Sequence, residues 1–349
     1  MKNLLLVLTV WVCCAPSSVR AQVAGSTAFG SLNSPGQARL AALSQAAVAH
    51  PEGDVGFSVL NPALLSWAWK QDSTGKTQKQ VALSSANWPG SYSQAEMAYG
   101  QRGWKSPHWS WGVGVRQSGT SALPLTNASG EVLGTFKAQE TMPRLTVAYA
   151  LSPRWSLGVN ASILMATYGV YNASAWTSDI GVAYKWADGL WATGGSVRHL
   201  GATYEHFGLH SERLPMDIQW GISQRLKHMP MRWMVSLTHL ETPDLAYLDP
   251  NQFTRDPLTG VRTYHPPSVA NRVLRHVLFG AELTPGGRLR LQISYDFRRQ
   301  IEMKLPTRGS NAGFSFGMGL QAGKMQWQYA NTSIHVAGRL HQFGLARHF

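Results

Sequence analysis

The sequence has 349 residues, a formal net charge of +13, 14 Trp, 34 Gly and only two Cys. After residue 21 no stretch approaches the roughly 20 consecutive apolar residues that a membrane-spanning helix needs, which excludes a helical membrane protein. The basic residues are spread along the chain. They therefore favour solvated loops, a polar lumen, or contacts with anionic lipid and acidic partners over nucleic-acid binding.

Residues 1–21 have the pattern of a secretory signal peptide. Lys2 supplies the positive charge, Leu4 to Val12 form a short apolar core, and Val19-Arg20-Ala21 is a cleavage site, so the mature chain is expected to begin at Gln22. Lipid modification at Cys13 or Cys14 is disfavoured because the residues before them are bulky. Both cysteines are removed with the signal, which leaves no disulfide, thiolate metal site or cysteine nucleophile.

Residues 22–79 lack the alternation of a strand and are predicted to form a small N-terminal plug, or hatch, that contains short helices. Arg39 to His50 is rich in Ala and carries apolar side chains at helical spacing. The tripeptide Asn61-Pro62-Ala63 follows and is the candidate hatch motif. A polar lumen of about 14 strands is wide enough to need filling, which favours a plug over the alternative, a periplasmic tail.

Residues 80–349 alternate between apolar and small or polar side chains, as a β-strand with two different faces does. From Trp155 to Met165 the odd positions are apolar, and the even ones include Ser156 and Asn160; Leu289 to Phe297 repeats the pattern. A soluble sandwich would alternate in the same way. Here the apolar face is rich in aromatic residues and the other in Gly and Ser, which favours an all-β transmembrane barrel.

The connections predict about 14 antiparallel strands and an orientation. Short turns such as Ser152 to Arg154 alternate with longer connections, the longest being Thr242 to Arg272. In outer-membrane barrels the short turns are periplasmic and the long loops lie at the cell surface, and an even strand count puts both termini in the periplasm. Met142-Pro143 interrupts the fourth predicted strand, so 12 or 16 strands stay open. The strands are expected near residues 80–88, 91–101, 108–118, 133–151, 154–170, 174–187, 190–200, 214–226, 231–241, 273–284, 288–304, 310–322, 324–335 and 338–349.

Six tryptophans are expected to form an aromatic girdle at one membrane interface. Each falls at a strand end beside a predicted periplasmic turn, whereas tryptophans of a soluble core would not keep to one end of the strands. They are Trp109, Trp155, Trp186, Trp191, Trp233 and Trp327.

Signals for catalysis are weak, so no catalytic, cofactor-binding or metal residue is assigned and the protein is not expected to be an enzyme. Glu205, His206, His210 and Glu212 have metal-ligand chemistry, but two His four residues apart converge only on a helix, and this stretch is predicted to be a loop. The sequence has no G-x-S-x-G, H-E-x-x-H or phosphate-binding loop.

The connection from Thr242 to Arg272 is the best candidate for binding a partner, because a long, non-repetitive loop on a rigid scaffold is often functional. It holds five prolines, which limit its disorder. The alternative is a solvated lid over the lumen. The residues of this connection that are candidates for partner binding are aromatic anchors and arginines that suit an acidic partner: Tyr247, Phe253, Arg255, Arg262 and Tyr264.

Several segments resemble a known family. Asn61-Pro62-Ala63 in an N-terminal hatch is similar to the FadL-like outer-membrane barrels, which have 14 strands. Within that superfamily the chain resembles the PorQ family of the type IX secretion system. The matching segments run over nearly the whole mature chain and include FGSLNSPGQARLAAL (29–43), NPALL (61–65), GEVLGTFKAQ (130–139), HLGATY (199–204), residues 214–223, LKHMP (226–230) and LTHLE (237–241).

The resemblance implies a non-enzymatic barrel in an attachment complex with PorU, PorV and PorZ, in which the barrel anchors the PorZ-like surface protein. That complex removes C-terminal sorting signals from cargo and links it to anionic lipopolysaccharide, and PorU is its sortase. The runner-up function is a FadL-like channel for hydrophobic small molecules with a movable hatch. The third is a membrane hydrolase with a Ser/His pair on the wall.

Overall fold

The structure is a computed structural model, and it describes residues 29–69, 78–103, 106–207, 213–246, 253–255, 258–259, 262–264, 267–303, 310–335 and 338–349, without the side chains of 253, 255 and 262–264. The predicted signal peptide lies outside the described residues. No helix among them is long and apolar enough to cross a membrane.

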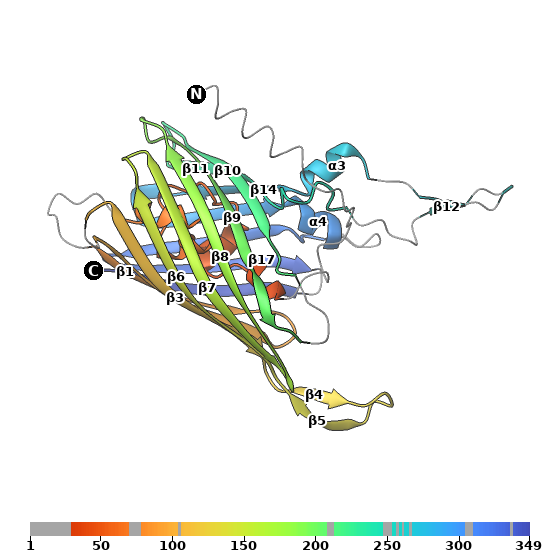
Figure 1. The fold of residues 1–349 in the computed structure, drawn as a ribbon. Helices are drawn as coiled ribbons and strands as arrows, with labels where there is room; N and C mark the ends of the chain where they lie inside the picture. Colours follow the sequence, from red (N-terminus) through yellow and green to blue (C-terminus); the bar gives the residue numbers. More distant parts are fainter. Residues whose placement is uncertain are drawn as a thin grey trace.

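Fourteen antiparallel strands close into a barrel in which the last strand pairs with the first (Figure 1). The closing seam has a regular register, with Leu83 opposite Leu345 on one side and Met97 on the other. The predicted count of 14 is confirmed. The wall strands are β1 (Lys79–Asn87), β2 (Tyr92–Arg102), β3 (Trp109–Thr120), β6 (Ala138–Ala150), β7 (Trp155–Tyr168), β8 (Tyr171–Lys185), β9 (Trp191–Glu205), β10 (Asp217–Arg225), β11 (Met231–Leu237), β14 (Val277–Leu283), β15 (Leu289–Asp296), β16 (Phe314–Ala322), β17 (Met325–His335) and β18 (Gly338–His348).

The alternation of the sequence forms the two faces of the wall. Successive residues of a strand point to opposite faces, and in β7 exposed apolar residues such as Trp155 and Val159 alternate with buried Ser156 and Asn160. In water this outer face would be an aggregation surface. In a bilayer its apolar side chains match the lipid, while the backbone polar groups pair within the closed sheet.

Five of the six tryptophans predicted to form a girdle take part in a row of ring contacts at one end of the strands; Trp327, on β17 and 52% exposed, is not part of this row. Trp109 lies 4.7 Å from Tyr149 and Trp155 lies 4.7 Å from Tyr184, measured between ring centroids. The row continues from Tyr184 through Trp186, Trp191 and Trp233, with centroid separations from 5.1 to 6.4 Å. Aromatic residues gather where a bilayer changes from hydrocarbon to head groups, so the row marks one membrane interface.

The two ends of the barrel differ. The turn end carries the short connections, such as 151–154 and 323–324, and the C-terminus. The loop end carries the longest connections, together with short ones such as 169–170. Two hairpins at the loop end pair only with themselves and project beyond the wall (Figure 1): β4 (Leu123–Thr126) with β5 (Val132–Phe136), and β12 (Phe253–Arg255) with β13 (Arg262–Tyr264). Helix α3 (Val269–Leu274) lies there too.

Two strands of the wall are clearly shorter in the structure than the sequence predicted. The strand expected over 133–151 is divided into β5 of the projecting hairpin and β6 of the wall. Pro143 does not interrupt β6, because it pairs with Val115 of β3 while the ladder to β7 has a gap at Met142 and Pro143. The strand expected over 288–304 ends at Asp296, whose carboxylate accepts a hydrogen bond from Arg299 N at 3.0 Å and caps helix α4 (Phe297–Met303).

The plug fills the barrel interior with short helical turns: η1 (Gly30–Asn33), α2 (Ala38–Ala42), η2 (Val55–Val59) and η3 (Pro62–Trp67). One further 3-10 helix among the described residues, η4 (Pro285–Gly287), lies outside the plug, in the turn-end connection between β14 and β15. The helix expected over 39–50 is only five residues long, because Ser44 and Gln45 adopt left-handed φ values of 47° and 63°. Plug leucines pack against small wall residues, so this segment forms the core of the molecule.

Candidate functional site

The hatch motif fastens the plug to the wall. Asn61 is fully buried and caps η3 by accepting a hydrogen bond from Ala63 N at 3.1 Å. Its side-chain amide donates to Val48 O in the plug at 2.9 Å and to Val182 O in β8 at 3.2 Å. One side chain therefore satisfies a helix terminus, a plug carbonyl and a wall carbonyl. Pro62 follows at the first helical position, where the missing N–H of proline costs no hydrogen bond.

Glycines of the wall make room for this motif. A Cβ added at Gly181 would lie 2.0 Å from Asn61 Oδ1, and one at Gly158 would lie 2.3 Å from the backbone of Pro62. Residues 158 and 181 face each other on β7 and β8. The Gly-rich lumen face predicted from the sequence is thus a close-packed seat for the plug, in which backbone lies directly against backbone.

Wall side chains donate hydrogen bonds to plug carbonyls around the barrel. Each bond contributes about 1 kcal/mol, and each also satisfies a buried carbonyl that would otherwise be costly. Together they hold the irregular plug backbone from many directions. The donors with their acceptors are Gln94 to Pro35 O, Ser156 to Ala63 O, Asn160 to Ser58 O, Ser196 to Leu60 O, Ser223 to Ala49 O, Ser294 to Ala42 O, Thr332 to Ala41 O and Gln342 to Gly36 O.

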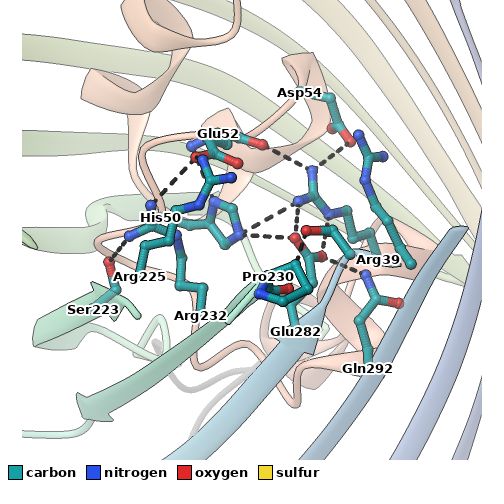
Figure 2. Close-up of polar contacts among 12 residues, drawn as sticks. Arg39, His50, Glu52, Asp54, Ser223, Arg225, Pro230, Arg232, Glu282 and Gln292 are labelled. Atoms are coloured by element: carbon teal, nitrogen blue, oxygen red, sulfur yellow. Dashed lines mark hydrogen bonds and ion pairs between the residues drawn. The ribbon is translucent and has the colours of Figure 1, made fainter. Parts of the chain in front are cut away.

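A buried ionic cluster joins the plug to β14 (Figure 2). Arg39 of α2 binds the carboxylate of Glu282 through Nε at 2.9 Å and Nη2 at 2.6 Å. The same carboxylate accepts a hydrogen bond from Gln292 at 2.7 Å and lies 3.4 Å from His50 Nε2. Arg39 and Glu282 are 5% and 3% exposed, so neither charge is compensated by solvent. The bidentate geometry is the strong form of this ion pair.

The plug contributes two further titratable groups beside this cluster. Burial, reinforced by the charge of Arg39, lowers the pKa of His50, so the imidazole is neutral near pH 7. Burial alone would raise the pKa of Glu52, but His50, Arg232 and Arg225 lower it below its usual value. Glu52 lies 3.2 Å from Arg225 and 3.3 Å from Arg232 at the edge of the plug.

A second ionic group lies in the lumen toward the loop end. Glu96 accepts 2.8 Å hydrogen bonds from both Arg116 and Arg144, and Arg198 lies 3.6 Å from Asp217. Charged side chains of the wall are buried in the lumen, among them Arg116, Asp179 and Asp217 near this group and Arg232 and Glu282 near the first cluster. Arg290 also faces the lumen. Asp296 ends β15 and caps α4, and Arg298 lies in α4, where it pairs with Glu302 at 3.0 Å.

The cavities show how tightly the plug fits. Two small cavities between plug and wall have volumes of about 20 and 10 Å³, room for about one water each. A hollow of about 610 Å³, lined by plug residues such as Trp67 and wall residues such as Lys185, opens at the turn end. Another hollow, about 690 Å³, is lined mainly by outward-facing side chains such as Met97 and Phe343, so it is a dent in the lipid-facing wall rather than a lumen.

The loop end presents apolar side chains away from the wall. In the projecting β4–β5 hairpin, Leu125, Val132 and Leu133 are 47%, 64% and 63% exposed. The candidate binding loop is described only in part: Tyr247 lies outside the described residues, and Phe253, Arg255, Arg262 and Tyr264 are placed on β12 and β13 without their side chains.

The weak metal candidates do not form a group among the described residues. Glu205 ends β9 and accepts a hydrogen bond from Ser174 at 2.9 Å, and His206 follows it, while His210 and Glu212 lie outside the described part of the chain. The ion pair of Arg39 with Glu282 was missed. A lone Arg in an Ala- and Leu-rich segment was the available signal, since a buried guanidinium requires an acidic partner.

No protein-family model and no curated protein matches the sequence. Among solved structures, the chain is similar to the TodX deltaS2S3 mutant monoaromatic hydrocarbon channel, at 11% identity and a TM-score of 0.53, covering 89% of this chain and 97% of that one. The TodX monoaromatic hydrocarbon channel deltaS2 mutant is 11% identical with a TM-score of 0.53, covering 92% of this chain and 98% of that one. The P. putida toluene transporter TodX is 11% identical with a TM-score of 0.50, covering 88% of this chain and 96% of that one. These likenesses show the fold alone, a closed β-barrel, which in this chain has 14 strands.

Proposed function

We propose that this protein is a non-enzymatic outer-membrane anchor whose loop end faces the cell surface and holds a partner protein there. The observation that carries this proposal is the sealed lumen. The plug is bonded to strands around the barrel, two cavities between plug and wall have room for about one water each, and the hollow of about 610 Å³ that they also line lies at the turn end. A barrel built to pass solutes needs a continuous opening, and the described residues of the lumen are packed instead.

The β4–β5 hairpin supports the docking role. It projects past the wall (Figure 1) and carries three exposed apolar side chains, Leu125, Val132 and Leu133, which we therefore infer to lie outside the bilayer. Apolar side chains that neither lipid nor core covers mark protein–protein contact sites. The hairpin is also two-stranded, so both of its edges are available for pairing with another chain.

The sequence resemblance supports a finer assignment. The segment Gly130 to Gln139, one of those that resemble the PorQ family, contains β5 of this hairpin. On that basis the partner is a PorZ-like surface protein, and the barrel belongs to a type IX attachment complex with components similar to PorU and PorV. The orientation, with both termini periplasmic, and the contact with lipopolysaccharide are parts of the same proposal.

Co-purification from outer membranes tests the anchor. The triple variant Leu125→Ser, Val132→Ser, Leu133→Ser is expected to lose the partner that the wild type retains, because it removes the apolar contact surface. Val170→Ser is the matched control: Val170 is 87% exposed at the same end of the barrel but lies outside the hairpin. Heat-modifiable migration verifies that each barrel is folded. A triple variant that keeps its partner refutes the hairpin assignment, and a second variant with residues 242–272 shortened then tests the other loop.

A channel for small hydrophobic molecules is the second candidate, because the similar structures are described as hydrocarbon channels and transporters. Locking the plug separates the two functions. Ser66 Oγ of the plug donates to Ser156 Oγ of β7 at 2.6 Å, so the Ser66→Cys, Ser156→Cys pair is placed to form a disulfide. The anchor retains its partner when locked. Uptake of a monoaromatic solute by wild-type proteoliposomes that stops on locking would establish the channel.

A further inference from the structure

Two hairpins of the wall carry the same short pattern where they reach the loop end. An Asp-Ile pair (179–180 and 217–218) faces a Ser-x-x-His-Leu run on the next strand (196–200 and 236–240). In both copies the His backbone is left-handed, with φ of 58° and 55°, and its N–H donates to the Asp carboxylate at 2.8 Å. The backbone geometry is therefore repeated in β8–β9 and β10–β11.

The two imidazoles are used differently. His199 Nδ1 lies 2.8 Å from the carbonyl oxygen of Pro215, and the residue two positions later is Gly201. His239 Nδ1 lies 3.2 Å from Glu241 Oε1 and 3.8 Å from Asp217 Oδ1. Only the second copy adds a carboxylate at this position and turns its ring nitrogen toward two acidic groups.

The three groups suit one metal ion. Their ligand atoms lie within 4.8 Å of one another. Ligands at about 2.1 Å from a tetrahedral Zn²⁺ are about 3.4 Å apart, which falls between the 3.2 and 3.8 Å measured from His239 Nδ1. An imidazole with two carboxylates favours zinc or a similar transition metal, because Ca²⁺ and Mg²⁺ prefer oxygen ligands alone.

The surroundings hold both carboxylates in place. Glu241 Oε2 accepts a hydrogen bond from Ile218 N at 2.8 Å, which leaves Oε1 directed at the imidazole. Arg198 lies 3.6 Å from Asp217 Oδ2 and balances one of the two negative charges. Metal-binding carboxylates are characteristically oriented by such outer contacts. Asp217 is buried, and His239 and Glu241 are each 12% exposed, so an ion here would still be accessible from the loop end.

We propose that Asp217, His239 and Glu241 bind one divalent transition-metal ion, with zinc as the expected metal, at the base of the longest connection of the barrel. Glu241 begins that connection, and Thr242 N donates to His239 O at 3.1 Å. The bound ion would fasten the start of residues 242–272 to β10. The site does not depend on the proposed anchor function, because it rests on the geometry of the wall.

Calorimetric titration of zinc into the full, tag-free and chelator-treated protein in detergent tests the proposal. One equivalent is expected for the wild type. Glu241→Gln keeps the side-chain shape but removes the charge, and His239→Asn keeps a residue that tolerates the left-handed backbone; each is expected to weaken binding at least tenfold. His199→Asn is the matched control, because it changes the repeated His that lacks the extra carboxylate.

The outcomes are distinct. Loss of zinc in the two site variants, with binding retained in His199→Asn and heat-modifiable migration normal in all, supports the site. A wild type that binds no zinc overturns the proposal. So does undiminished binding in Glu241→Gln and His239→Asn, which would assign the ion to other surface groups, or equal loss in His199→Asn, which would show a general effect on the fold.

Discussion

Arg39 and Glu282 offer the sharpest test of how the plug is held. Replacing Arg39 with Met leaves the buried Glu282 carboxylate in direct contact with Gln292 and neutral His50, without its bidentate cation. Breaking one side of a buried pair costs about 3–5 kcal/mol. At about 1.4 kcal/mol per factor of ten, the equilibrium for plug release shifts by roughly 10² to 10⁴. In the double variant Arg39→Met, Glu282→Leu no charge is stranded, and the remaining cost is the unpaired Gln292 amide, about 1–3 kcal/mol.

Maleimide labelling measures this equilibrium. Ser156 is fully buried under the plug, and both cysteines of the sequence lie in residues 13–14, so Ser156→Cys gives a single reporter in the mature chain. Its labelling rate is expected to rise about a hundredfold or more with Arg39→Met and to fall back at least tenfold in the double variant. If Arg39→Met labels at the wild-type rate, or if the double variant labels as fast as the single one, the ion pair does not hold the plug.

The same reporter tests two further features. Gly181→Ala is expected to accelerate labelling, because its Cβ would lie 2.0 Å from Asn61 Oδ1, whereas Gly134→Ala, in open space, leaves the rate unchanged; equal rates would exclude a close-packed seat. Lowering the pH from 7 to 5 is also expected to accelerate labelling. In the docked plug the pKa of His50 is lowered, whereas in the released plug it is about 6.5. Below about pH 6.5 the released plug therefore binds more protons than the docked one, so the docked state loses stability on acidification. The pKa of Glu52 is lowered by the neighbouring cations, which moves its titration away from this window. His50→Gln should therefore flatten the profile, and an unchanged profile would exclude His50 as the cause.

The wall was predictable from the sequence because its signal is local. Alternation such as that of β7 recurs in several strands, and each of the fourteen wall strands overlaps a predicted one. The errors arose where a local cap or a hairpin competed with the pattern, as at Asp296, where a capped helix replaced the end of a strand.

The candidate sites were harder, since they depend on residues far apart in the chain. Asn61 was found through a short motif, but its contact with Val182 spans 121 residues, and the pair of Arg39 with Glu282 spans 243. No periodicity encodes such pairings. The sequence does hold one signal for the group of Asp217, His239 and Glu241. This signal is the repeated Ser-x-x-His-Leu run, which a comparison of the strands with one another would have detected.

The bonds between plug and wall also constrain the order of assembly. Their donors include residues of β2 near the start of the barrel and of β17 and β18 at its end, and the seam of β18 with β1 closes the ring. A segment bonded on so many sides would have to form all of these bonds together if it entered a finished cylinder. The last strand is therefore expected to wrap around a plug that is already in place, so that faults in the plug appear as barrels that fail to close during biogenesis.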